Sequence, residues 1–476
     1  MQANLTRALI GIYGAMIIGL ASYMYTVYPN TGDEHAVYFQ AQIFASGRIV
    51  APAPSLPNLF ATDYVRIENG NWFSEHPPFN SLIHAPFFAL GFKSLGMGVF
   101  AALFLLLFMA FMQRQGVSPL ASTVAGIALA FSPTFIFHSA SYLSHVPAAL
   151  LFLLALDQGG RFRDGQGDLR LVALPLGLLA VCRPFDAFLL APSLIWWMGA
   201  ANILNIGGRS LVSAVLIGAA PVALTIFFSV VATGSWTIPY FTAAAADGAL
   251  FNLTLGWTEI SRAWLLFIET GAWVGAGIFD SGIPRTRLPT DFNFGLHLFV
   301  VLWIIATYRA VRHRDRLAIL AVVSGASMIF GFAFFDGAMK GRFGGRYMFT
   351  ALPLLFIPFA QALEHEIRAR SKIILTVAAV LLLGLYSYGL FSTIRVFRNE
   401  NPSRLELFMK AEKSQAGTLI FVRDAPLFHR SWYIRNHPEL KGTVIVPFLS
   451  DSENLRTLEI FKPAQTLYYP DYTEAK

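Results

Sequence analysis

The chain has 476 residues, of which 55% are hydrophobic and only 13% are charged. Soluble domains carry about 25% charged residues, so this chain lacks the polar surface that a water-soluble globule needs. Several apolar runs reach the roughly 20 residues that cross a bilayer, which indicates a polytopic membrane protein. The net charge of +7 lies mostly in short loops between these runs, a pattern typical of membrane topology rather than of nucleic-acid binding. The single cysteine, Cys182, excludes an intrachain disulfide and a cysteine metal cluster.

The first apolar run, 8–28, follows Arg7 and has no convincing small-residue cleavage site, so we expect a retained first span. A long loop at 29–81 comes next. It is bracketed by two polar clusters, Gly-Asp-Glu-His at 32–35 and Glu-His-Pro-Pro at 75–78.

Asp33 and Glu34 form a carboxylate pair directly after this first span. A carboxylate pair at a membrane boundary is costly to bury, so the pair predicts a functional site in which Asp33 acts as a base. Glu34 is expected to orient either Asp33 or the group that it deprotonates. The alternative is that Asp33 only caps a short helix, since residues 35–48 carry apolar side chains at helical spacing.

The remaining apolar runs predict repeated crossings, about eleven in all with the first span. The expected spans are 95–112, 119–137, 146–156, 171–181, 185–200, 211–232, 296–307, 317–335, 347–363 and 373–391. The stretch 82–90 is too short to cross and is expected at the interface. A second long loop, 234–293, contains a moderately apolar part, 257–279, with charges inside it, which favours an interfacial or re-entrant helix pair.

The basic residues orient the chain. They concentrate in alternate short loops at 113–118, 159–170, 201–210, 308–316 and 364–372. Positive loops face the cytoplasm, so the N-terminus is expected inside. The other loops are then expected to face outward, namely 29–81, 138–145, 234–293 and 336–346, together with the C-terminal tail.

Residues 396–476 differ from the membrane part, 1–395. Short β-branched or aromatic runs at 418–422, 443–447 and 466–469 predict strands, and 451–461 predicts a helix. We therefore expect an all-α polytopic membrane domain with a small α/β appendage on its outer, extracytoplasmic face, packed on the membrane domain.

Cationic residues on the outward side form a second candidate site. Glycines allow a backbone to approach a ligand, and guanidinium forks match phosphate oxygens. The candidates are Lys340, Arg342 and Arg346 in the glycine-rich loop 336–346, and Arg183 between two short spans. The alternative is that these residues contact lipid headgroups or pair with Asp336 and Asp186.

His76 and His145 are further candidate site residues on the outward side. Together with His35, His138 and the two carboxylates they could make a metal site. No tight ligand spacing supports one, so no metal is predicted and the cofactor stays open. Aromatic residues of the outer loops, such as Tyr64 and Tyr240, could stack on a sugar, but interfacial aromatic belts explain them equally well.

Several short motifs occur together along the chain. They are Asp33-Glu34 before the aromatic Val37-Tyr38-Phe39, Glu75-His76-Pro77-Pro78-Phe79, Ser132-Pro133, Val146-Pro147-Ala148-Ala149, Gly345-Arg346-Tyr347 before Leu352-Pro353, and the tail from Phe421-Val422-Arg423 to Tyr468-Tyr469-Pro470. This pattern resembles the GT-C membrane glycosyltransferases, and is most similar to the protein O-mannosyltransferases and the lipid A aminoarabinose transferase.

The resemblance implies a GT-C fold and an inverting glycosyl transfer from a polyprenyl-phosphate-linked sugar to a hydroxyl acceptor. It implies that Asp33 is the catalytic base. The acceptor would be an envelope glycan, a lipid or a protein, and the location a bacterial inner membrane with the site facing the periplasm. The metal-ligand pattern of the aminoarabinose transferase is not matched.

Two other function classes fit an outward polar site in a membrane protein. One is a lipid-linked sugar flippase or other transporter, and the other is a non-catalytic envelope-assembly protein. Transporters tend to carry repeats and broken helices around a mid-membrane site. Here the polar residues gather at one face and no repeat is evident, which favours an enzyme.

Overall fold

The computed structural model describes residues 2–24, 29, 31–241, 293–333, 349–368, 387, 402–423 and 434–469. Three predictions fall outside the described residues: the helix pair at 257–279, the glycine-rich loop 336–346, and the crossing at 373–391.

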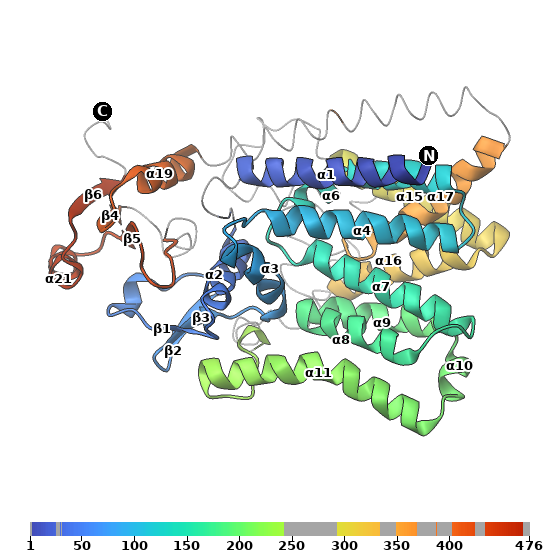
Figure 1. The fold of residues 1–476 in the computed structure, drawn as a ribbon, viewed down its shortest axis with the longest axis horizontal. Coiled ribbons are helices and arrows are strands. Elements are labelled where there is room, and N and C mark those ends of the chain that lie inside the picture. The colour runs from blue at the N-terminus through green and yellow to red at the C-terminus, as the bar shows by residue number, and fades with distance from the viewer. Residues whose placement is uncertain are drawn as a thin grey trace.

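The membrane part is a set of helices, most of which lie side by side along the long axis of the molecule, while the short helix Ala200–Leu204 connects two longer ones at one end (Figure 1). They are α1 (Gln2–Met24), α4 (Leu95–Arg114), α5 (Pro119–Ala130), α6 (Pro133–Ser139), α7 (His145–Arg163), α8 (Leu169–Cys182), α9 (Pro184–Met198), α10 (Ala200–Leu204), α11 (Gly208–Thr233), α15 (Asn293–His313), α16 (Arg316–Ala333) and α17 (Leu352–Arg368). Within the described residues, α4 and α11 are long and apolar enough to cross a membrane alone. The count of eleven spans stays a prediction.

The helices pack through small residues and one continuous apolar core. Gly177 on α8 lies directly against the backbone carbonyl of Gly218 on α11, where a Cβ would collide. Small residues of this kind let the backbones of membrane helices approach closely. The core includes Phe104, Phe108 and Phe152, all buried.

Two predicted spans differ from the structure. The expected span 119–137 is divided, because Ser132 caps a new helix by accepting a hydrogen bond from the N–H of Phe135 (3.3 Å), and Pro133 occupies the first position of α6. The expected short return 146–156 is a longer helix, α7, that begins at His145. This division leaves the irregular link 140–144 between α6 and α7.

The loop 29–81 contains regular structure that the sequence analysis did not predict beyond one helix. Its elements are α2 (Gly32–Ala45), β1 (Ala51–Pro52), the 3-10 turn η1 (Pro57–Leu59), β2 (Val65–Glu68) and β3 (Asn71–Ser74), followed by α3 (Phe79–Ala89). The strands form an antiparallel sheet in the order β1-β3-β2. Asn69 and Gly70 join β2 to β3 with φ of 50° and 78°, the positive values that a two-residue hairpin turn requires.

The C-terminal residues form a three-stranded parallel sheet in the order β5-β4-β6. Its elements are α19 (Pro402–Lys413), β4 (Thr418–Val422), β5 (Val444–Pro447), α21 (Asp451–Phe461) and β6 (Gln465–Tyr469). These strands fall where the sequence predicted them. That the unit lies outside the membrane stays a prediction.

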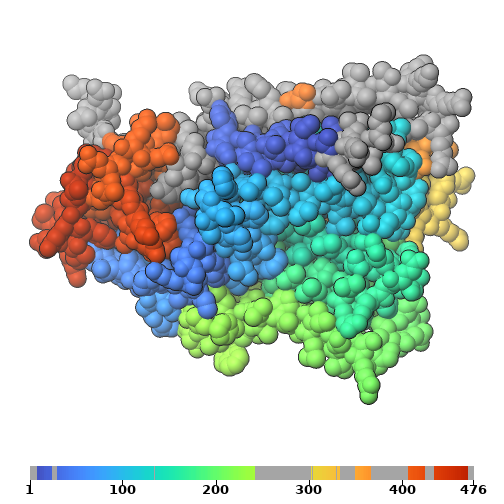
Figure 2. Space-filling view, in the orientation of Figure 1, coloured from blue at the N-terminus to red at the C-terminus, as the bar shows by residue number. Residues whose placement is uncertain are grey.

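The C-terminal unit packs on the 29–81 segment. Phe421 and Val446 share an apolar cluster with Phe39 of α2 and Trp72 of β3. Figure 2 shows the C-terminal residues, in orange and red, beside the light-blue residues of this segment at one end of the molecule. The catalytic candidate helix α2 is therefore held between the membrane helices and the C-terminal unit, since Val37 and Ala41 on α2 belong to the membrane core.

Candidate active site

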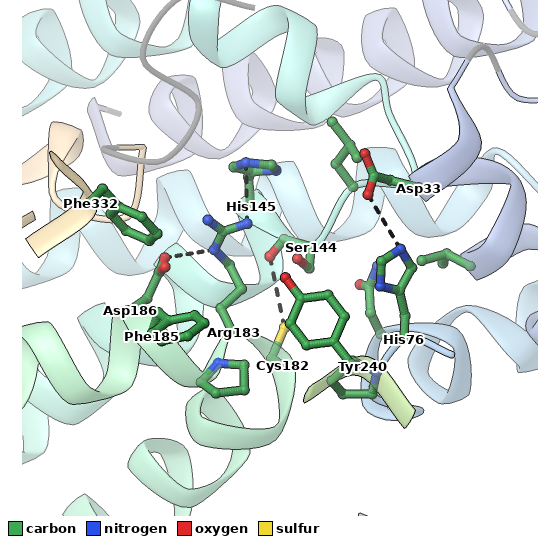
Figure 3. A pocket seen from close by; sticks show the side chains of 15 residues that line it. Asp33, His76, Ser144, His145, Cys182, Arg183, Phe185, Asp186, Tyr240 and Phe332 are labelled. Carbon is green, nitrogen blue, oxygen red and sulfur yellow. Dashed lines mark hydrogen bonds and ion pairs between the residues drawn. The ribbon is translucent and has the colours of Figure 1, made fainter. Parts of the chain in front are cut away.

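A cavity of about 120 Å³ lies where α2, α3, the link 140–144 and the α8–α9 junction meet. It is lined by Asp33, Val37, His76, Pro77, Asn80, Leu143, Ser144, His145, Cys182, Arg183, Pro184, Phe185, Asp186, Tyr240 and Phe332. Four of the eight predicted site residues are therefore brought together, namely Asp33, His76, His145 and Arg183 (Figure 3).

Asp33 reaches the cavity from the first turn of α2. The cap of this helix is Thr31, whose hydroxyl accepts from the N–H of Glu34, so the alternative in which Asp33 itself caps the helix is wrong. The side chain of Asp33 is 28% exposed and lies 3.3 Å from Nε2 of His76. A carboxylate near a helix N-terminus is stabilised in its ionised form by the helix dipole.

His76 stands beside Asp33 between aromatic rings. Its imidazole stacks on Tyr64 at 5.0 Å between centroids and lies 5.5 Å from the ring of Tyr240. Tyr64 adopts a positive φ of 62°, a strained backbone for a residue with a large side chain. The backbone at 64 is held by the N–H of Glu75, which donates to the carbonyl of Tyr64 (2.9 Å).

Glu34 has a different environment from Asp33. Its side chain is fully buried and Oε2 accepts from the backbone N–H and the hydroxyl of Thr31, both at 3.2 Å. Its other oxygen, Oε1, accepts from the backbone N–H of Tyr142 at 3.1 Å. Glu34 thus faces the link between α6 and α7 and does not line the cavity.

Arg183 lies at the junction between α8 and α9 with its side chain only 12% exposed. Its Nε donates to Oδ2 of Asp186 (2.7 Å), and Thr350 donates its hydroxyl to the same oxygen (2.5 Å). The pairing with Asp186 that the sequence offered as an alternative is therefore present, and Arg183 also lines the cavity. Figure 3 shows the guanidinium between Asp186 and His145.

His145 lies beside Arg183 in the cavity. Its Nε2 lies 3.2 Å from Nη1 of Arg183. A guanidinium only donates, so Nε2 must accept, which places the proton of a neutral imidazole on Nδ1. The ring also stacks on His138, with centroids 4.2 Å apart. The geometry therefore favours a neutral His145 that orients Arg183.

The other predicted site residues, Lys340, Arg342 and Arg346, lie outside the described residues. Among the residues that are described, no group of three or more His, Cys, Asp or Glu side chains is arranged to hold a metal ion.

The cavity and its surroundings also contain residues that were not predicted as site residues, among them Tyr240, Asn80 and Thr350. Tyr240 lines the cavity from the segment after α11, Asn80 lies in the first turn of α3, and Thr350 bonds to Asp186. The position of Asn80 after Pro77-Pro78 was the available signal, because a polar residue at the start of an apolar helix needs a partner. The contacts of Thr350 and Tyr240 are long-range and carry no local signal.

Comparison with solved structures defines the class of protein, a membrane protein with the GT-C fold. Neither a protein-family model nor a curated protein sequence matches the chain.

Solved structures do match. The chain is similar to ArnT from Cupriavidus metallidurans bound to undecaprenyl phosphate, with 14% identity, a TM-score of 0.51, and coverage of 96% of this chain and 89% of that chain. It is also similar to ArnT from the same organism in the apo state, with 13% identity, a TM-score of 0.51, and coverage of 97% and 89%. ArnT is the lipid A aminoarabinose transferase, so these matches confirm the GT-C resemblance at the level of the fold.

Proposed function

We propose that this protein transfers a sugar from a polyprenyl-phosphate carrier to a hydroxyl acceptor at the extracytoplasmic face of a bacterial inner membrane. The observation that carries the proposal is that one cavity is lined by both the carboxylate of Asp33 and the guanidinium of Arg183. Glycosyl transfer from a phosphate needs these two groups together, because a base must act on the acceptor and a cation on the leaving group.

The acceptor side of the reaction is assigned to Asp33. Its carboxylate takes the proton of the acceptor hydroxyl, and the oxygen attacks the anomeric carbon of the donor sugar. The bond between that carbon and the phosphate oxygen breaks on the opposite side, so the anomeric configuration inverts. His76, 3.3 Å from Asp33, holds the carboxylate toward the acceptor position.

The donor side is assigned to Arg183. The electron pair of the broken bond passes to the phosphate oxygen, and the phosphate stays attached to its lipid. A guanidinium stabilises this charge more strongly in the transition state than in the bound donor. Lys340, Arg342 and Arg346 are proposed to add cationic charge to the same phosphate site.

The nature of the donor is supported by the fold neighbour. ArnT from Cupriavidus metallidurans was solved with undecaprenyl phosphate, a lipid phosphate of the class proposed here. Apolar walls beside the polar cavity, among them Val37, Phe185 and Phe332, suit the first isoprene units of such a lipid. The acceptor is a hydroxyl of an envelope glycan, a lipid or a protein.

The test is release of undecaprenyl phosphate from a lipid-linked sugar by the purified protein in micelles, with membranes of the native host as the acceptor source. Asp33→Asn keeps the shape and removes the base, and turnover is expected to fall about 10²-fold or more. The matched control is Glu68→Gln, an exposed carboxylate on β2 outside the cavity. Turnover by a folded Asp33→Asn protein equal to that of the control would refute the assignment.

The same assay separates the proposal from its two rivals. A flippase would move the lipid-linked sugar across proteoliposome membranes without releasing undecaprenyl phosphate. A non-catalytic assembly protein would do neither, and Asp33→Asn would leave the envelope glycans of the cell unchanged.

A further inference from the structure

The backbone of Tyr142 is held on both sides of its Cα by side chains from two different helices. Its N–H donates to Oε1 of Glu34 on α2 (3.1 Å), and its carbonyl accepts from Nδ2 of Asn80 on α3 (2.8 Å). Both partners are buried, at 0% and 3% exposed. These bonds join segments 108 and 62 residues apart in the chain.

The irregular backbone around Tyr142 explains why such partners are needed. Residues 140–144 lie between α6 and α7. The two helical ladders reach only the ends of this link, where the N–H of Ala140 donates to Ile136 and the carbonyl of Ser144 accepts from Ala148. A buried N–H or carbonyl without a partner is costly, and side chains must then supply the hydrogen bonds. Glu34 suits the N–H because a carboxylate has two accepting oxygens, so that one can bond to Thr31 and the other to Tyr142.

Tyr142, whose backbone is clamped in this way, lies next to the residues that form one wall of the cavity. Leu143, Ser144 and His145 follow it directly and line the cavity, and His145 contacts Arg183 at 3.2 Å. On the other side, Glu34 follows Asp33 directly in the chain, and its hydrogen bond to Thr31 fixes it at the start of α2. One carboxylate therefore connects the helix of the base to the wall that contacts the cation, Arg183.

We propose that Glu34 and Asn80 are positioning residues, which clamp the backbone of Tyr142 and thereby set the distance between Asp33 and the His145–Arg183 pair. This inference rests on the proposed function. It assigns Glu34 a role through the link between α6 and α7 rather than through Asp33 or the acceptor. The reason that such a clamp matters is geometric, because a displacement of about 1 Å in a catalytic site can cost 10²-fold in rate.

Removing either clamp residue is predicted to change kcat and to leave the KM for the donor nearly unchanged. Arg183 is also held by Asp186 from α9 (2.7 Å), so donor binding survives when the clamp is cut. Asn80→Ala and Glu34→Ala are therefore expected to lower kcat about 10- to 100-fold while the KM for the lipid-linked donor changes less than about 3-fold. Because both variants release the backbone of the same residue, Tyr142, the double variant is expected to lose little more than either single one.

The experiment measures the link and the reaction separately. Hydrogen exchange of peptides covering 140–145 is followed by mass spectrometry, and kcat and KM are measured in micelles with undecaprenyl-phosphate-linked sugar. Asn71→Ala is the matched control, because Asn71 also bonds through Nδ2 to backbone carbonyls, those of Val231 and Ala232, away from the cavity. The clamp variants should speed exchange at 140–145 and lower kcat, whereas the control should do neither.

The experiment distinguishes failure of the positioning role from failure of the proposed function. Faster exchange with an unchanged kcat in Asn80→Ala, in a preparation where Asp33→Asn is inactive, would overturn the positioning role and leave the proposed function intact. No transfer by the unaltered protein would overturn the proposed function. In that case, unchanged exchange at 140–145 in Asn80→Ala and Glu34→Ala would also overturn the clamp itself.

Discussion

His84 is expected to make this protein sensitive to mild acid. It lies on α3, an 11-residue helix of roughly 16 Å, which is too short to span a bilayer. The imidazole is 1% exposed and packs edge-on against Tyr142 (5.4 Å) and Phe100 (5.3 Å). Within the described residues its Nδ1 has no hydrogen-bond partner, and burial lowers the pKa of His84 from 6.5 to about 4.

The sign and size of the effect follow from this pKa. Above pH 6.5 His84 is neutral in both the folded and the unfolded chain, so it has no effect on stability. Between pH 6.5 and 4 the unfolded chain binds a proton that the folded chain does not, and the free energy of unfolding falls by about 1.4 kcal/mol per pH unit. The loss between pH 7 and pH 5 is about 2 kcal/mol.

The assay is denaturant unfolding in micelles at pH 7 and pH 5, followed by tryptophan fluorescence, for the unaltered protein and for His84→Gln. Glutamine is close in size and does not titrate in this range, and the other histidines titrate in both proteins. The variant is expected to lose about 2 kcal/mol less than the unaltered protein over this interval. Equal losses in the two proteins would show that His84 is not held neutral by burial.

Three further predictions follow from the site, the topology and the C-terminal contact. Arg183→Lys keeps the charge but loses the forked guanidinium, so kcat should fall about 10-fold or more. The control Arg170→Lys, at an exposed position, should leave kcat unchanged. An equal kcat in the two variants would show that Arg183 does not belong to the phosphate site. In intact spheroplasts, Glu68→Cys and Glu459→Cys should react with an impermeant thiol reagent. Gln113→Cys should react only after lysis. The reverse pattern would show that the predicted topology is inverted. Phe421→Ala removes a fully buried ring from the apolar cluster that the C-terminal unit shares with α2, and should lower the free energy of unfolding by about 3–5 kcal/mol. The control Leu455→Ala, at a position 62% exposed, should have little effect. Similar free energies of unfolding for the two variants would show that the C-terminal unit does not pack on α2.

Much of the helical framework was predictable because the apolar runs are long and their ends carry clear signals. The run at 171–181 ends just before Arg183-Pro184 and the run at 185–200 begins just after it. In the structure α8 ends at Cys182 and α9 begins at Pro184. The division of 119–137 was missed although Ser132-Pro133 is a helix-start signal. The β2–β3 hairpin was missed although Asn69-Gly70 is the strongest short-range hairpin signal, because the whole segment was treated as a loop.

The candidate site was predictable only where a residue's chemistry conflicts with its location. Asp33 and Arg183 stood out as charges beside apolar runs, and both line the cavity. Glu34 has the same type of side chain as Asp33 and is its neighbour, yet a helix turns successive side chains by about 100°, so one faces the cavity and the other faces Tyr142. The partner 108 residues away that fixes this difference leaves no trace in local sequence.

The surroundings of α2 give a physical reason for the C-terminal unit. Phe39 and Ile43 belong to the apolar cluster that includes the C-terminal sheet, and Val37 and Ala41 belong to the core of the membrane helices. A 14-residue helix is marginal in water by itself, so its stability depends on packing of its faces. The orientation of Asp33 is therefore set from two directions, and loosening either contact should displace the carboxylate relative to Arg183 before it unfolds the membrane helices.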